Sequence, residues 1–323
     1  MKIGILGGGS CFALSLARIA QDHGIDCFGI GRSEQKQPAF WLAPPEYRYY
    51  QAHVVDQLGK VVRILEEERP NVIVCFAAQG EGAASFNENA PDFFRTNTWG
   101  LSNLVRNLHG STWLERFIQI GTSELYGSTT EPATEASPLK PSSPYAISKA
   151  AFDQFLEVMF RVNQFPMNII RPSNCLVEGQ QLYRIVPKAA VHSLAGKKLP
   201  LHGGGKAQKS YLHADDLSRA ILAVAEKAPF GKIYNVAPPT AISIRALVGY
   251  VIESCGKLWE EVVEETEDRV GQDAKYALDA SAIANDCGWK QTIHLAEGVE
   301  RVVSWVRKYP ELLTMPTSYE HRV

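Results

Sequence analysis

The sequence predicts an α/β protein with a doubly wound parallel sheet of the Rossmann type and a smaller α/β domain after it. Short apolar runs alternate with helix-like stretches through the first half of the 323 residues. A glycine-rich turn follows the first run, and Pro, Gly and long polar connections become frequent in the second half. Strands that alternate with helices favour a parallel sheet covered on both faces, because crossover connections are right-handed.

Each element of the first half is predicted from its own pattern. Runs of β-branched or apolar residues predict strands at Lys2 to Leu6, Cys27 to Ile30, Val72 to Phe76, Phe117 to Ile120 and Asn168 to Arg171. Helical spacing of apolar residues predicts helices at Ala13 to His23, Gln57 to Glu68 and Ala146 to Val158. Ser143 and Pro144 precede the third helix and are typical of a helix start.

These elements divide the chain into two predicted domains. Residues 1–172 form a dinucleotide-binding domain, for which an alternating pattern with a glycine-rich first turn is typical. Residues 173–323 mainly form a substrate-binding domain, because the pattern becomes less regular after Pro172. We expect residues 211–236 to return to the first domain.

Composition narrows the class of protein. The 33 Lys and Arg residues nearly balance 35 Asp and Glu residues, which argues against a basic surface for nucleic acid. No apolar stretch is long enough to span a bilayer, and Met1 to Leu6 resembles a first strand more than a secretion signal. We therefore expect a cytoplasmic protein. The six cysteines are dispersed without a Cys-x-x-Cys pair, so we expect reduced thiols and no metal site.

Tyr145 and Lys149 are the most informative pair of residues. They stand four positions apart in a predicted helix, so both lie on one face. A neighbouring ammonium favours the ionised phenol and lowers its pKa. Such a phenol can take a proton from an alcohol while a nicotinamide takes the hydride from the same carbon. Thr122, after the strand ending at Ile120, would hold that hydroxyl in place.

The turn from Gly7 to Ala13 predicts a phosphate-binding loop, because it follows a strand and opens a helix. Ser10 and Ala13 replace the second and third glycines of the Gly-x-x-Gly-x-x-Gly pattern, and the Ser10 hydroxyl could donate to a phosphate. The other reading is an ordinary tight turn. The predicted cofactor contacts are Gly7, Gly9, Ser10, Cys11, Phe12, Arg32, Ser33, Ala77, Ala78, Tyr145 and Lys149.

The end of the second strand bears on the choice of cofactor. The sequence from Gly29 to Ser33 contains no Asp or Glu to bind the adenosine ribose. A guanidinium at Arg32 and a hydroxyl at Ser33 suit a 2′-phosphate, so we favour NADP(H), with NAD(H) as the alternative. Arg32 could also be an ordinary surface residue.

The chain resembles the extended short-chain dehydrogenase/reductase family of nucleotide-sugar-modifying enzymes over nearly its whole length. The resemblance rests on the turn, on Thr122, Tyr145 and Lys149, and on the segments from Arg95 to Gly100, Leu125 to Gly127 and Arg171 to Asn174. It implies that Asn97 supports the active-site lysine. It also implies that Asn174 lies near the diphosphate of a nucleotide sugar.

Two further segments resemble 4,6-dehydratases of this family. Thr122 to Gly127 is similar to the active-site segment of GDP-mannose 4,6-dehydratases. Asp268 to Asp279 resembles the phosphate-contacting motif of dTDP-glucose 4,6-dehydratases, which implies that Arg269 binds the diphosphate. The nucleotide base therefore stays open. Gln79 and Glu81 stand where dehydratases usually carry a Ser-His pair near the sugar, so the sugar could differ as well.

These residues predict a 4,6-dehydratase reaction. Tyr145 acts as base while C4 is oxidised, and the resulting ketone acidifies the hydrogen on C5. Glu124 removes that proton. Loss of the C6 hydroxyl as water and return of hydride to C6 give a 4-keto-6-deoxy sugar. Ser123 is a poor acid, so it would position a water or leave protonated Glu124 to serve both steps.

Other readings remain open. A nucleotide-sugar 4-epimerase, a UDP-glucuronate decarboxylase and a dehydratase that stops at the 5,6-alkene share much of this pattern. A non-catalytic protein that senses NADP would not need Thr122, Glu124, Tyr145 and Lys149 together. The segments from Leu101 to Leu108 and from Ala150 to Val162 could pair in a homodimer, or pack on the sheet instead.

Overall fold

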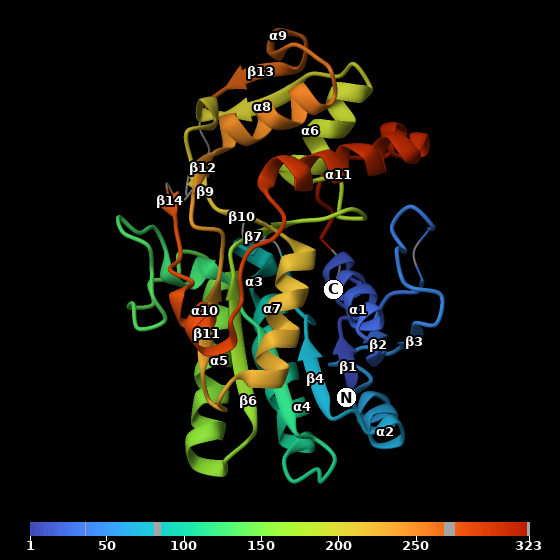
Figure 1. The fold of residues 1–323 in the computed structure, drawn as a ribbon, viewed down its shortest axis with the longest axis vertical. Helices are drawn as coiled ribbons and strands as arrows, with labels where there is room; N and C mark the ends of the chain where they lie inside the picture. Colours follow the sequence, from blue (N-terminus) through green and yellow to red (C-terminus); the bar gives the residue numbers. More distant parts are fainter. Residues whose placement is uncertain (36, 81–84, 268–274, 322–323) are drawn as a thin grey trace.

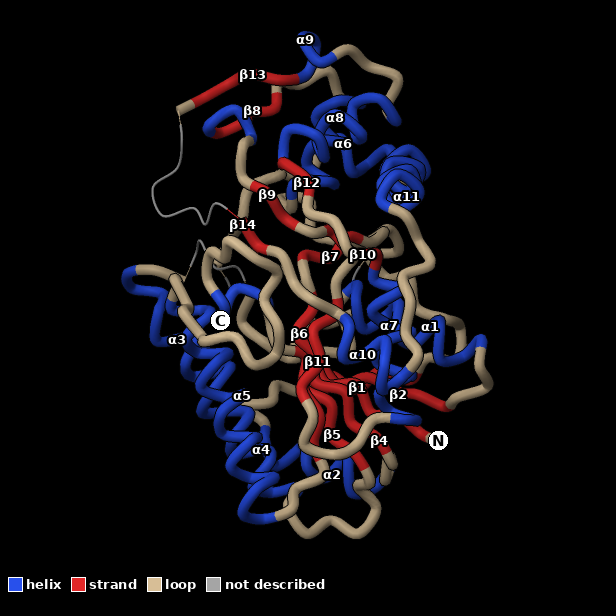
Figure 2. The backbone as a smooth tube through the Cα atoms, turned by 60° about the vertical axis from the view of Figure 1, so that its left-hand side comes forward, coloured by secondary structure: helices blue, strands red, loops and turns tan. Residues whose placement is uncertain are grey.

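The structure of the protein is a computed structural model that describes residues 1–35, 37–80, 85–267 and 275–321. Its core is a seven-stranded parallel sheet with the strand order β11-β6-β5-β4-β1-β2-β3 (Figure 1). Helices cover both faces of this sheet, which confirms the predicted doubly wound α/β fold (Figure 2).

The strands of this sheet are β1 (Lys2–Leu6), β2 (Asp26–Gly31), β3 (Arg48–Gln51), β4 (Val72–Cys75), β5 (Arg116–Ile120), β6 (Met167–Pro172) and β11 (Ile233–Val236). The helices are α1 (Cys11–Asp22), α2 (Leu58–Glu68), α3 (Ala90–Phe94), α4 (Leu101–Leu108), α5 (Pro144–Asn163), α6 (Ile185–Leu194), α7 (Ala214–Lys227), α8 (Ile244–Ser254), α9 (Trp259–Val262), α10 (Ser281–Cys287) and α11 (Leu295–Lys308). The strands outside the large sheet are short. They are β7 (Asn174–Leu176), β8 (Leu199–His202), β9 (Gln208–Lys209), β10 (Tyr211–His213), β12 (Ile242–Ser243), β13 (Val263–Thr266) and β14 (Lys275–Tyr276).

The direction in which strands are added reverses between β1 and β4. From β1 the chain adds β2 and β3 on one side, whereas β4, β5 and β6 follow on the other. Ligands of open parallel sheets bind beyond the carboxyl ends of the strands at such a switch point. The carboxyl ends of β1, β4 and β5 therefore form the edge at which a ligand is expected.

Two apolar cores enclose the sheet. Alternate strand residues such as Ile3 and Ile5 pack with α1 and α7 on one face, while Leu6 and Ile30 pack with α2, α4 and α5 on the other. The apolar residues of α4 belong to the second core, as one of the two readings of this segment expected.

The long helix α5 begins as the sequence predicts. Ser143 caps it by accepting a hydrogen bond from the Ala146 amide at 3.1 Å, and Pro144 occupies the first turn. The helix continues past the predicted end at Val158 to Asn163, where Gln164 takes a left-handed conformation with φ of 53°.

Glu68 ties the end of α2 to the edge of the sheet. Its carboxylate accepts from Tyr50 and lies 2.5 Å from Lys2 Nζ and 3.2 Å from an Arg48 nitrogen. Burial would raise the pKa of Glu68, but the hydrogen bonds from Lys2, Tyr50 and Arg48 outweigh it. They lower this pKa from 4.5 to about 2.

A third apolar core lies outside the sheet and joins α6, α8 and α11 in the upper part of Figure 1. Residues 211–236 contain β10, α7 and β11, and β11 pairs with β6 in the large sheet. The connection between β2 and β3 reaches this third core, because Trp305 Nε1 donates to the Ala39 carbonyl at 2.7 Å. The limits of the two domains stay a prediction.

None of the helices in the described part of the chain has the length and apolar character needed to cross a bilayer. The six cysteines are free, and Cys175 is the most accessible of them. Within the same described residues, no group of three or more His, Cys, Asp or Glu side chains is arranged to hold a metal ion.

Candidate active site

The glycine turn lies at the end of β1, against the end of β4. The Gly7 and Gly8 amides both donate to the Ile30 carbonyl, at 2.8 and 3.0 Å. Gly7 has a φ of +75°, and a Cβ there would lie 2.7 Å from the Ala77 nitrogen. Only glycine fits this conformation and this close approach. The turn therefore packs directly on the backbone that follows β4, with no room for a side chain at position 7.

Ser10 has a second use in the structure. Its Oγ caps α1 by accepting from the Ala13 amide at 3.2 Å. A hydroxyl that accepts one bond still has its hydrogen to donate, so the predicted phosphate contact remains compatible with the cap. Cys11 is buried against Val177, and Phe12 packs beside it. The N-terminus of α1, with its partial positive charge, faces the turn.

The end of β2 contains a feature that the sequence did not suggest. Arg32 and Ser33 are exposed, and their contact with a cofactor stays a prediction. Tyr49 from β3 crosses this end and donates its hydroxyl hydrogen to the Ser33 carbonyl at 2.7 Å. A Cβ at Gly31 would lie 2.6 Å from that hydroxyl oxygen. The phenol therefore takes the space that an acidic side chain at position 31 would need. Burial raises the pKa of Tyr49 to about 12.

Tyr145 and Lys149 stand in the first turns of α5. Lys149 is 1% exposed, and its Nζ donates to the Ile120 carbonyl at the end of β5 at 2.7 Å. Burial lowers the pKa of Lys149, although the nearby Asp153 opposes this. Tyr145 is half-buried, and its ring meets Phe93 edge-on with centroids 6.2 Å apart. The predicted effect of Lys149 on the phenol stays a prediction.

Thr122, Ser123 and Glu124 follow β5 directly. Thr122 caps the short helix η4 (Ser123–Tyr126), because its Oγ1 accepts from the Glu124 amide at 3.2 Å. Thr122 and Ser123 are buried, whereas Glu124 is half-buried. Since Lys149 bonds to Ile120, the helix with Tyr145 and the segment with Glu124 are fixed to the same strand end.

Asn97 lies in a π-helical segment, η3 (Arg95–Gly100), and is fully buried. Its side chain accepts from the Gln79 amide at 2.7 Å and donates to the Gln79 carbonyl at 2.9 Å. It also donates to Ser148 Oγ at 3.0 Å, next to Lys149 in the chain. Asn97 thus joins the segment after β4 to α5, the helix of Tyr145 and Lys149. Its supporting role for the lysine stays a prediction.

A buried polar network that we did not predict lies behind Lys149. Asp153, one turn further along α5, accepts from Arg171 Nε at 3.0 Å. Arg171 also donates to the Tyr126 hydroxyl at 2.9 Å, and that hydroxyl donates to Asn235 at 2.9 Å. Asp153 is fully buried and Arg171 is 1% exposed. The sequence did contain a signal for this network. Asp153 stands four residues after Lys149, as Lys149 does after Tyr145, so all three share one face of the helix.

The structure describes two of the four predicted substrate contacts. Gln79 is buried through its backbone bonds to Asn97, and Ala77 and Ala78 precede it at the end of β4. Asn174 is half-buried in β7, which pairs with β10. Glu81 and Arg269 lie outside the described residues.

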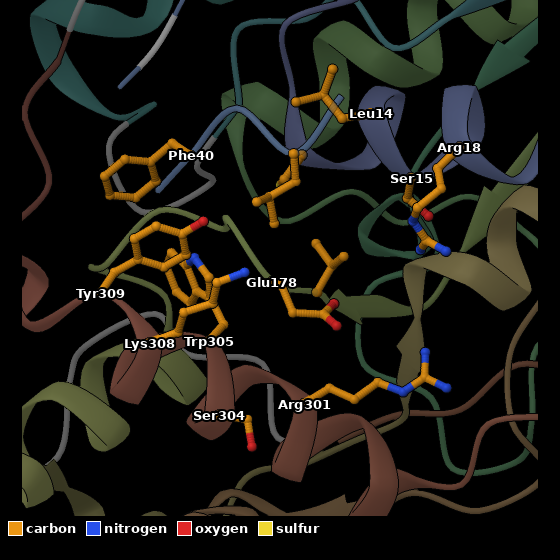
Figure 3. Close-up of a pocket in the computed structure, with 13 residues that line it drawn as sticks. Leu14, Ser15, Arg18, Phe40, Glu178, Arg301, Ser304, Trp305, Lys308 and Tyr309 are labelled. Atoms are coloured by element: carbon orange, nitrogen blue, oxygen red, sulfur yellow. The ribbon is translucent and has the colours of Figure 1, made fainter. Parts of the chain in front are cut away.

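A cavity of about 420 Å³ lies on the other side of α1 (Figure 3). Aromatic side chains gather at one end of it, and Arg18 and Arg301 lie at the other. Both arginines pair with the buried carboxylate of Asp215. Among the predicted site residues that the structure describes, only Cys11 lines this cavity. The catalytic candidates lie elsewhere, beyond the ends of β4 and β5.

The residues at the switch point fit a nicotinamide dinucleotide. The N-terminus of α1, which follows the close-packed turn at Gly7, and the buried ammonium of Lys149 supply positive charge that suits a diphosphate and a ribose. For the adenosine part of such a cofactor, the end of β2 offers the phenol of Tyr49 and the guanidinium of Arg32 and no carboxylate.

Comparisons with known proteins agree with this arrangement. The model of the NAD dependent epimerase/dehydratase family matches residues 3–237. A dTDP-glucose 4,6-dehydratase of Streptomyces griseus is 31% identical over 268 residues, which cover 82% of this chain and 79% of that protein. The dTDP-D-glucose 4,6-dehydratase of Mus musculus is 31% identical over 269 residues, which cover 81% of this chain and 74% of that protein.

Solved structures are similar over nearly the whole length. A dTDP-glucose 4,6-dehydratase from Streptomyces venezuelae with NAD bound has a TM-score of 0.88 at 27% identity and covers 96% of this chain and 98% of its own. That of Bacillus anthracis in complex with NAD has a TM-score of 0.85 at 25% identity, with the same coverage. The chain therefore belongs to the NAD dependent epimerase/dehydratase family.

Proposed function

We propose that this protein is a nucleoside-diphosphate-sugar 4,6-dehydratase. The observation that carries the proposal is the bond of 2.7 Å from Lys149 Nζ to the Ile120 carbonyl, which fixes the helix of Tyr145 to the strand that ends in Thr122 and Glu124. A redox tyrosine and a carboxylate at one strand end suit oxidation of a carbon followed by removal of a proton from its neighbour. The two relatives reported above are named as 4,6-dehydratases of dTDP-glucose.

Tyr145 takes the proton from the C4 hydroxyl of the sugar in the proposed reaction, and Thr122 holds that hydroxyl. A bound nicotinamide would accept the hydride from C4 and return it to C6. Lys149 keeps its ammonium beside the site, because burial and the bond to Ile120 leave it little freedom.

Glu124 removes the proton from C5 once C4 is a ketone. Its half-buried position leaves the carboxylate accessible to a substrate while η4 holds its backbone. The C6 hydroxyl leaves as water, with its proton supplied by protonated Glu124 or through a water that Ser123 positions. Return of the hydride to C6 requires a proton at C5, which solvent supplies while Tyr145 releases to solvent the proton it took from the C4 hydroxyl. The product is a 4-keto-6-deoxy sugar.

We propose a nucleotide diphosphate as the rest of the substrate, with Asn174 near the diphosphate and Gln79 on the sugar side. The proposal also assigns Glu81 to the sugar and Arg269 to the diphosphate. dTDP-, UDP- and GDP-hexoses are the candidates to compare.

NADP(H) is our proposed cofactor, because Arg32 and Ser33 stand at the end of β2 without an acidic partner for a ribose hydroxyl. The solved relatives contain NAD. Dissociation constants for the two cofactors, measured by calorimetry, decide between them. NAD(H) that binds as tightly as NADP(H), or more tightly, refutes this preference.

Mass spectrometry of products tests the reaction. The protein is incubated with a panel of nucleotide hexoses and a nucleotide hexuronic acid. Loss of water with a 4-keto product supports the proposal, and loss of water without a ketone indicates an alkene-forming dehydratase. Loss of carbon dioxide indicates a decarboxylase, and an unchanged mass with an altered sugar indicates an epimerase. Tight cofactor binding without turnover on the whole panel would indicate a sensing protein.

The variant Glu124→Gln separates the two chemical steps. We expect reduced cofactor and a 4-keto hexose to accumulate in a single turnover, while elimination falls by about 100-fold or more. Glu131→Gln, which changes an exposed carboxylate in the following connection, is the matched control. Wild-type turnover by Glu124→Gln would remove Glu124 from the mechanism.

We further propose a cytoplasmic homodimer formed through η3 and α5. Trp99 is 59% exposed on η3, and Ile147 and Val162 are 44% and 68% exposed on α5. Apolar residues of this size on neighbouring helices favour contact with a second copy of the chain.

A further inference from the structure

The C-terminal segment from Met315 to His321 lies along the protein as an extended strap. Its residues alternate in exposure: Met315, Thr317, Tyr319 and His321 are half-buried, and the residues between them are exposed. This period of two is that of an extended chain with one face against the protein. Figure 2 shows the C-terminal end of the chain beside α3.

The strap is attached at both ends. Near α6, the Thr317 hydroxyl lies 3.0 Å from His192 Nε2, and the Tyr319 ring meets Tyr183 edge-on with centroids 5.1 Å apart. At α3, His321 Nε2 lies 2.8 Å from an Asp92 carboxylate oxygen. The strap therefore runs from the helix that follows Asn174 to the helix beside Tyr145.

A continuous series of rings connects the strap to the catalytic tyrosine. His321 stacks on Phe93 with centroids 5.9 Å apart and an angle of 28° between the rings. Phe93 is fully buried and meets Tyr145 edge-on at 6.2 Å. Phe93 contacts both Tyr145 and His321, so the position of His321 affects the position of the phenol through Phe93.

We infer that the strap is a built part of the active site and that His321 is a positioning residue, acting on Tyr145 through Phe93. This inference rests on the proposed function for the role of Tyr145. The imidazole holds Phe93 by stacking, and Asp92 orients the imidazole. A phenol that must meet a sugar hydroxyl at hydrogen-bond distance gains from this support, because small misplacements of a reacting group reduce rates strongly.

Variants at position 321 separate stacking from hydrogen bonding. His321→Phe keeps a ring on Phe93 and loses the bond to Asp92, whereas His321→Asn keeps a polar group and loses the ring. We expect the single-turnover rate of cofactor reduction by the nucleotide sugar to fall about tenfold in His321→Ala and His321→Asn. It should return to within about twofold of wild type in His321→Phe.

The control is Ser318→Ala, an exposed position on the opposite side of the strap. It should keep the wild-type rate. Equal rates in all the variants, or equal losses in Ser318→Ala and His321→Ala, would overturn the inference. Recovery of the rate in His321→Phe is the result that ties the loss to the ring on Phe93 and not to general loosening of the strap.

Hydrogen exchange measured by mass spectrometry tests the strap without any activity. In the wild-type protein, amides of residues 90–95 should be protected, since the Arg95 amide donates to carbonyls of α3, and His321→Ala should increase exchange in that peptide. Equal exchange of residues 90–95 in the two proteins refutes the inference. If His321→Ala does increase this exchange but no nucleotide sugar reduces the cofactor, the proposed function fails and the support of α3 by the strap remains.

Discussion

Asn97→Ala should remove a large part of the stability of the fold as well as activity. The Asn97 amide satisfies both backbone groups of Gln79, at 2.7 and 2.9 Å, in a place where Gln79 is only 4% exposed. The substitution leaves one amide and one carbonyl buried without that partner. Each such group costs about 1 to 3 kcal/mol, so the free energy of unfolding should fall by about 2 to 6 kcal/mol. The whole free energy of unfolding of a typical domain is about 5 to 15 kcal/mol.

Urea unfolding followed by tryptophan fluorescence and circular dichroism measures this loss. Cofactor is kept at one fixed concentration, because a bound ligand adds to the apparent stability. Asn107→Ala is the matched control, since that exposed amide bonds to the Asn103 carbonyl on the surface of α4. It should change the free energy of unfolding by less than about 0.5 kcal/mol. A loss for Asn97→Ala no larger than that of the control refutes this reasoning.

Three further predictions test other parts of the fold. The pKa of Glu68 is about 2 in the fold against an ordinary 4.5, so its stabilisation is complete above pH 4.5 and is lost as the pH falls toward 2. At about 1.4 kcal/mol per pKa unit this is about 3 kcal/mol, and in acid unfolding titrations Glu68→Gln should abolish that part of the pH dependence. Gly7→Ala should weaken cofactor binding, measured by calorimetry, far more than Gly24→Ala does. Gly24 has a similar φ of +68°, but no atom of the described residues lies within 4 Å of a Cβ added there. In light scattering, Trp99→Glu should give a monomer and Leu258→Glu, at a 67% exposed position away from α5, should not; a dimer for both disproves the proposed interface.

The sequence predicted five strands of the large sheet, namely β1, β2, β4, β5 and β6. Buried parallel strands are continuous apolar runs, so β1 and β4 could be predicted almost to the residue. The strand β3 was not predicted, because the run from Arg48 to Gln51 is polar at both ends and lies at the edge of the sheet. Its Tyr49, which fills the space beside Gly31, was missed for the same reason.

Long-range contacts account for the rest of what sequence patterns did not reveal. Local spacing put Lys149 on the face of Tyr145, but the hydrogen bond to Ile120 depends on how α5 crosses the sheet. Asp153 looks like a solvated carboxylate on a helix until Arg171 comes from the next strand to meet it. The strap has no periodic apolar pattern of its own, and its ring contacts are made with distant parts of the chain, Tyr183 before α6 and Phe93 in α3.

The contact between Ala39 and Trp305 has a consequence for how the chain folds during synthesis. These residues are 266 positions apart, so this contact cannot form until the ribosome has reached Trp305. At about 5 to 20 residues per second, that interval lasts about 13 to 50 seconds. Throughout it, the apolar side chains that α11 will cover, Phe40 and Leu42 among them, stay exposed on a nascent chain, and that is where a chaperone would have reason to bind.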